Sequence, residues 1–155
     1  LVPQIADAVR QPVIAAGGIA DGRGIAAAIA LGAAGVQMGT AFLSCPEAGT
    51  DPRHRALLAR ATETDTMVTD AVSGRSARAA RSRYAEAMEA AREPLPAFLQ
   101  MYGLTDPLLD AGQDDVASFH LYGQAARLNR AIPAADLLRI LVGETEAAFI
   151  RIAAR

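Results

Sequence analysis

The stretch at residues 12–43, PVIAAGGIADGRGIAAAIALGAAGVQMGTAFL, decides the fold of this chain. Residues 13–16 are an apolar run too short for a helix, which predicts a fully buried parallel strand. Residues 22–31 predict an alanine-rich helix, and residues 35–38 predict the next strand. Strand, helix and strand within about thirty residues make a βαβ unit, which builds either a doubly wound sheet or a (β/α)8 barrel.

A glycine-rich turn follows each of the two predicted strands. Gly17 and Gly18 follow the first strand, and Gly39 and Thr40 follow the second. Ligands of parallel α/β folds lie at the carboxyl ends of the strands, where glycine lets the backbone approach closely. The first N–H groups of the helix that Asp21 caps are also expected to be unpaired and to favour an anion. The two turns together predict a phosphate site.

Composition restricts the classes of function. The 155 residues carry a formal net charge of −2, which gives no electrostatic attraction to nucleic acid or to an anionic membrane. No apolar run is long enough to span a bilayer. All 15 basic residues are Arg, so lysine Schiff-base chemistry within this chain is excluded. The single cysteine, Cys45, excludes an internal disulfide and predicts a reducing, cytoplasmic location.

The rest of the chain predicts a mostly helical region. We divide the chain into residues 1–50, the α/β part, and residues 51–155, a helical region that packs on it. A β-branched run at 66–69 predicts an edge strand or an extended segment. Residues 95–104 predict an irregular segment or a short helix. Helices are predicted from apolar spacing and capping residues at 1–10, 51–62, 76–92, 118–130 and 134–154.

Three motifs resemble one protein family. The run AAGGIADGRGIAAAIALGAAGVQMGTAFL at 15–43 resembles the flavin-phosphate segment of nitronate monooxygenases, and the related flavin-dependent enoyl-ACP reductases share much of it. The run DTMVTDAVSGRSARAARSRYAEAME at 65–89 is similar to the family's segment after the barrel. SFHLYGQAARL at 118–128 is similar to its later Gly-Gln helix. The resemblance covers most of the chain.

The resemblance implies a flavoenzyme fold and a cofactor site. The family has an FMN-binding TIM barrel with a smaller helical domain. This chain is therefore expected to be the C-terminal part of an α/β fold, a (β/α)8 barrel: its last two βα units, followed by a mostly helical segment. Family members oxidise alkyl nitronates with dioxygen to a carbonyl compound and nitrite. The residues expected to hold FMN, mainly through its phosphate, are Gly17, Gly18, Gln37, Met38, Gly39 and Thr40.

The resemblance also implies that the family's catalytic histidine lies upstream of Leu1. A parallel barrel cannot close with two strands, and the strand faces would be left without partners. We therefore expect a fragment of a full enzyme that does not turn over substrate alone, and we assign no catalytic residue within it. Two alternatives stay open: a flavin-dependent enoyl-ACP reductase that uses a nicotinamide cofactor, and a catalytically silent fragment. The sequence leaves the oligomeric state open.

The other chemistry-bearing residues have two interpretations each. His120 and Gln124 either line a substrate pocket or serve packing, and Arg75 and Arg78 either form a solvated face or bind an anion. Cys45 is interpreted as a small buried residue, since no base or cation activates it in the local sequence. Two distant histidines and one cysteine predict no metal site.

Overall fold

The structure is a computed structural model that describes residues 1–91, 94–111 and 119–154. The chain forms two compact units, one made of Leu1–Ala61 with Ala125–Arg155 and the other of Thr62–Gln124. The first unit therefore combines the N-terminal part of the chain with the C-terminal helix.

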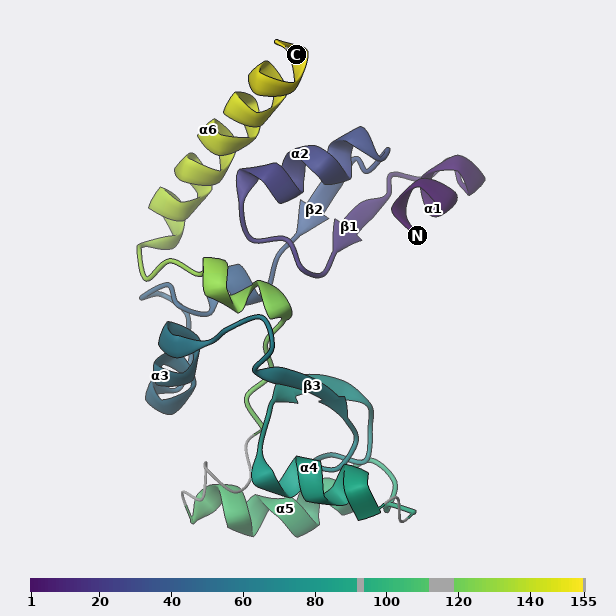
Figure 1. Cartoon of the computed structure of the whole chain (residues 1–155), viewed down its shortest axis with the longest axis vertical. Helices are drawn as coiled ribbons and strands as arrows, with labels where there is room; N and C mark the ends of the chain where they lie inside the picture. Colours follow the sequence, from purple (N-terminus) through teal and green to yellow (C-terminus); the bar gives the residue numbers. More distant parts are fainter. Residues whose placement is uncertain (92–93, 112–118, 155) are drawn as a thin grey trace. The chain divides into compact units, whose positions relative to one another are not determined.

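The first unit begins with a βαβ arrangement. Its first elements are α1 (Val2–Ala8), β1 (Ile14–Ala16), α2 (Gly22–Ala30) and β2 (Gly35–Gln37). The strands β1 and β2 pair in parallel with Ala16 opposite Gln37, and Figure 1 shows α2 beside this pair. The predicted strand–helix–strand order and its parallel pairing are confirmed.

Only one face of this two-stranded sheet is buried. Ala15 is buried together with Ala28 and Ala33, and Val36 of β2 packs against them. Ile14, whose neighbour in the strand is Ala15, is 54% exposed. The prediction of a fully buried strand at 13–16 is therefore wrong, because helical cover reaches only the face that carries Ala15.

The helix α2 begins at a side-chain cap and packs through small residues. Asp21 precedes the helix and accepts a hydrogen bond from the N–H of Gly24 at 2.9 Å, as the sequence predicts. The buried residues of α2 are Gly22, Ala26 and Ala28. Small side chains on one face allow a neighbouring backbone to approach closely.

The C-terminal helix packs on this face of α2. The remaining elements of the first unit are η1 (Thr40–Phe42), α3 (Pro52–Arg60), most of η2 (Gln124–Leu128) and α6 (Ala134–Ala153). They confirm the helices predicted at 51–62 and 134–154. A Cβ atom built at Gly22 would lie 2.4 Å from the backbone carbonyl carbon of Glu144 in α6. The two backbones are therefore so close that only glycine fits (Figure 1).

The second unit contains a β-hairpin as well as helices. Its elements are β3 (Thr66–Thr69), β4 (Ala77–Ala80), α4 (Arg83–Ala91) and α5 (Gln100–Asp110). The strands β3 and β4 pair antiparallel, with Thr66 opposite Ala80, which confirms the strand predicted at 66–69. The helix α5 runs on past residue 104, where the sequence predicts the end of a short helix.

Two predicted helices are wrong in part. The segment 76–92 begins with β4 and turns helical only in α4, and its last residue lies outside the described residues. Alanine and arginine are good helix formers, but tertiary contacts often override intrinsic propensity, and here pairing with β3 outweighs it. The segment 118–130 is not helical at 119–123, where Leu121 bridges to Ala79, and residue 118 lies outside the described residues.

The contact at Gly22 gives a test of how α6 is fixed. We expect Gly22→Ala to lower the free energy of unfolding by about 2 kcal/mol or more, because the new methyl group overlaps the Glu144 backbone. The matched control is Gly143→Ala, on α6, where a Cβ meets nothing within 4 Å. The control should raise stability by roughly 0.5–1 kcal/mol, since it removes a mid-helix glycine. Equal effects in urea unfolding would contradict the close contact.

Candidate functional site

The two glycine turns lie next to each other at the carboxyl ends of β1 and β2. The parallel pairing of Ala16 with Gln37 brings the residues that follow each strand to the same edge of the sheet. Gly17 and Gly18 have φ angles of +98° and +72°, a left-handed conformation that favours glycine. All six residues that the sequence predicts for the cofactor site therefore lie in or directly before these two adjacent turns.

The backbone of both turns is open. A Cβ atom built at Gly17, Gly18 or Gly39 would meet nothing within 4 Å. Among the described residues, the N–H groups of Gly18 and Gly39 donate no hydrogen bond to the protein. Exposed N–H groups in a glycine turn form a concavity that can bind an anion. The turns thus provide both the space and the donors that a phosphate group requires.

The side chains beside the second turn have different environments. Gln37 is exposed at the end of β2. Met38 instead packs against the buried cluster of Cys45, Leu137 and Leu141, and it lines an apolar pocket of about 340 Å³ next to α6. The Met38 side chain therefore belongs to the core, so only its backbone is available to a ligand at the turn.

The N-terminus of α2 is not free, which corrects an expectation from the sequence. The N–H of Gly22 donates to Glu144 Oε2 at 3.0 Å, and the N–H of Gly24 donates to Asp21 Oδ1 at 2.9 Å. Two protein carboxylates thus already occupy the N-terminus of α2, where an anion would otherwise be stabilised. The glycine turns, and not this helix end, carry the donors that remain open.

Asp21 is held as a carboxylate by its neighbours. Burial by itself raises the pKa of Asp21, but hydrogen bonds from the Gly24 N–H and from Arg23 bring it below its ordinary value. The guanidinium Nε of Arg23 donates to Asp21 Oδ2 at 2.7 Å. This carboxylate therefore stays ionised and keeps capping α2 in mildly acidic solution.

The loop after the second turn is fixed by residues that the sequence reasoning missed. Arg55 of α3 donates three hydrogen bonds to the carbonyls of Ser44, Ala48 and Thr50, at 3.0, 2.5 and 3.2 Å. In the same loop, Glu47 accepts from the N–H of Ala134 at 3.1 Å, at the first residue of α6. No local motif marks either residue, because their partners are carbonyl and N–H groups elsewhere in the chain.

The remaining candidates have structural environments. Cys45 is 1% exposed, and burial raises the pKa of its thiol, which agrees with its interpretation as a small buried residue. In the second unit, Arg78 donates to Thr66 Oγ1 at 3.0 Å across the hairpin, and Gln124 donates to the Glu63 carbonyl at 3.3 Å. Within the described residues, no group of three or more His, Cys, Asp or Glu could hold a metal ion.

Among the helices of the described residues, none combines the length and the apolar character needed to cross a bilayer.

A parallel βαβ unit with open glycine turns after both strands is an arrangement typical of α/β proteins that bind phosphate-bearing ligands. The family model described as nitronate monooxygenase matches residues 1–144, and the chain belongs to this family. A probable nitronate monooxygenase of Staphylococcus aureus strain Newman is 40% identical over 147 residues, which cover 93% of this chain and 41% of the relative. The chain thus spans about two fifths of the length of the curated relatives that it matches.

Two solved structures are similar to this chain. A nitroalkane oxidase from Streptomyces ansochromogenes has a TM-score of 0.86 at 33% identity, and the match covers 98% of this chain and 44% of that one. FabK from Thermotoga maritima has a TM-score of 0.83 at 34% identity, covering 99% of this chain and 50% of that one.

Asp21 gives a prediction for pH dependence. Asp21→Ala removes the N-cap of α2 and should lower the free energy of unfolding by about 1 kcal/mol at neutral pH. Because the folded pKa lies below the ordinary value of 3.8, the carboxylate's contribution is fully present above that pH. It disappears as the pH falls through the folded pKa. The stability difference between wild type and Asp21→Asn in urea unfolding should therefore shrink in acid, and a growing difference would contradict the assignment.

Proposed function

We propose that this chain supplies the phosphate site for FMN in a nitronate monooxygenase with a (β/α)8 barrel, in which β1 and β2 are the last two strands. The observation that carries this proposal is the pair of open glycine turns at the carboxyl ends of two adjacent parallel strands. Family membership and the rule that barrels bind phosphate after their last two strands support the same conclusion.

Each residue of the site would have a definite role. The N–H groups of Gly18 and Gly39 would donate to the phosphate, and Gly17 provides the left-handed turn. The Thr40 hydroxyl would add a donor, and Gln37 is exposed at the end of β2 beside the turn. Met38 would contribute its backbone alone. FMN, when bound, supplies the electron chemistry, and this chain binds and orients it.

Exposed apolar side chains on the first unit indicate that further protein packs against it. Ile14 is 54% exposed on the sheet, and Leu138, Val142 and Ile150 of α6 are 52%, 58% and 70% exposed. Leu138 and Val142 also line the apolar pocket next to α6, and exposed apolar surface of this kind often packs against other protein. We therefore propose that further βα units of a barrel cover it, and that the catalytic base belongs to those units. The isolated chain is not expected to turn over substrate.

The proposed reaction is the oxidation of alkyl nitronates by dioxygen to a carbonyl compound and nitrite. The similarity to FabK supports a second candidate, a flavin-dependent enoyl-ACP reductase.

Activity assays on the whole protein that carries this chain distinguish a nitronate monooxygenase from an enoyl-ACP reductase. We expect the purified protein to be yellow, with the absorbance of oxidised flavin, and to release nitrite from an alkyl nitronate without any nicotinamide cofactor. Consumption of reduced nicotinamide with an enoyl thioester would favour the reductase instead. A colourless protein that takes up no FMN would contradict both.

Gly18 gives a test of the phosphate turn. We expect Gly18→Ala to weaken FMN binding by about tenfold, because a left-handed conformation costs alanine roughly 1–2 kcal/mol and the turn relaxes away from it. Gly49→Ala is the matched control: Gly49 is exposed, a Cβ there meets nothing within 4 Å, and its φ is not left-handed. Quenching of flavin fluorescence measures both dissociation constants. An unchanged affinity in Gly18→Ala would exclude this turn from the site.

A further inference from the structure

The carboxylate of Glu144 connects α6 to the end of the first glycine turn. Glu144 Oε2 accepts a hydrogen bond from the N–H of Gly22 at 3.0 Å, across 122 positions of sequence. Gly22 lies four residues after Gly18 and starts α2. The contact therefore fixes the point where the turn meets the helix.

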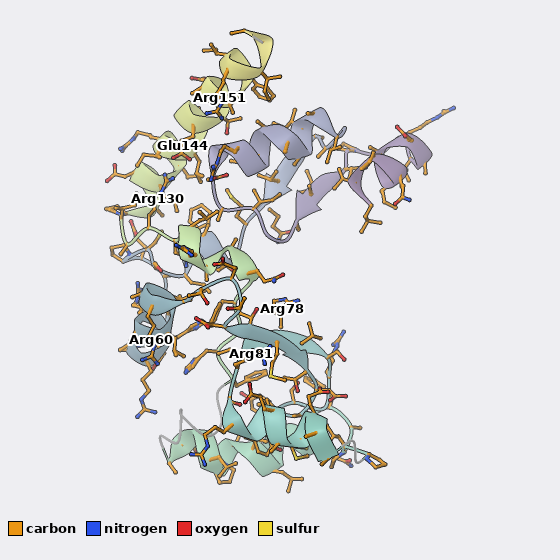
Figure 2. All side chains as sticks on the ribbon, in the orientation of Figure 1. Arg60, Arg78, Arg81, Arg130, Glu144 and Arg151 are labelled. Atoms are coloured by element: carbon orange, nitrogen blue, oxygen red, sulfur yellow. The ribbon has the colours of Figure 1, made fainter. Side chains whose placement is uncertain are left out.

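Arg130 in turn holds Glu144. Its Nη2 atom lies 2.5 Å from Glu144 Oε1, so the two carboxylate oxygens have different partners. The side chains of Arg130 and Glu144 are only 31% and 34% exposed, and they line a pocket of about 290 Å³. Asp21, Arg23 and Arg151 also line it, so three guanidinium groups face two carboxylates. Figure 2 labels Arg130, Glu144 and Arg151 on or beside α6.

An anionic side chain beside a phosphate turn has two opposite effects. It stabilises the start of α2 by accepting from an N–H group that has no partner within the helix. Its charge also repels a phosphate bound a few residues away, unless a cation neutralises it. The hydrogen bond with Arg130 supplies that neutralisation, and it leaves the structural bond to Gly22 in place.

We propose that Glu144 is a positioning residue for the phosphate turn and that Arg130 is its required counter-charge. Glu144 fixes the backbone after Gly18 through Gly22, so that the open N–H groups of the turn keep the orientation that a phosphate needs. Arg130 holds the carboxylate and cancels its repulsion. This inference rests on the proposed FMN phosphate site and adds to it two residues on or beside the C-terminal helix.

The comparison of FMN with riboflavin tests this role, because the two flavins differ only by the phosphate. Dissociation constants are measured by flavin fluorescence quenching on the apoprotein of the whole protein that carries this chain. We expect Glu144→Ala to weaken FMN binding by about tenfold and riboflavin binding by less than about twofold, since a lost hydrogen bond to a charged group has that order of effect. Glu144→Gln keeps an acceptor for the Gly22 N–H and should weaken FMN less.

The counter-charge is tested by Arg130→Met. This variant removes the cation that is hydrogen-bonded to the carboxylate, so FMN binding should weaken by about five- to tenfold with riboflavin unchanged. The double variant Arg130→Met/Glu144→Gln removes both charges and should recover most of the FMN affinity. Arg139→Met is the matched control, since Arg139 pairs with Asp136 on the exposed side of α6, and it should change neither constant. Thermal unfolding of each apoprotein shows whether the variants remain folded.

Different outcomes would overturn the roles of Glu144 and Arg130 and the FMN phosphate site itself. If Glu144→Ala and Glu144→Gln weaken FMN binding and riboflavin binding by the same factor, Glu144 has only a general structural role and the inference is overturned. A double variant no better than Arg130→Met would overturn the role of Arg130. Wild-type protein that binds FMN no better than riboflavin would overturn the phosphate site itself, and that result appears before any variant is made.

Discussion

The packing of α6 against the start of α2 is the constraint on which the first unit depends. At Gly22 the two backbones approach so closely that no side chain fits between them, and the Glu144 carboxylate takes the first N–H of α2. The sheet beneath has only two short strands, which are weak by themselves. A helix from the far end of the chain therefore stabilises the βα turn that follows β1.

The same helix fixes the second turn through different contacts. Leu137 and Leu141 bury Cys45, which follows η1, and Met38 packs against this cluster. The Glu47 carboxylate accepts from the first N–H of α6, while Arg55 holds the carbonyls of the loop between them. Both turns are rich in glycine, and contacts with the rest of the first unit hold them at their ends. This combination suits a ligand site, because open donors are held on a fixed frame.

The sequence predicts the parts of this fold that depend on neighbouring residues. The βαβ unit, the Asp21 cap and the two glycine turns follow from short patterns, and the structure confirms their arrangement. The prediction is wrong at β4, where helix-favouring residues pair with β3 and with Leu121. It is also wrong about the free N-terminus of α2, because Glu144 lies 122 positions away. Glu144 is one of several charged residues in α6, so no local signal marks it as the partner of Gly22.

Occupation of the α2 N-terminus changes how a phosphate must be recognised here. A helix end attracts any anion through its partial positive charge, and it does so with little regard for shape. In this chain Asp21 and Glu144 already satisfy that end, so the helix offers an additional anion little attraction. In the proposed site, recognition would rest on the directed N–H groups of the turns at Gly18 and Gly39, and the contact at Gly22 would hold the first of these turns in place. A site of this kind would discriminate by geometry, so the position of α6, which supports the first turn, would matter as much as the turns themselves.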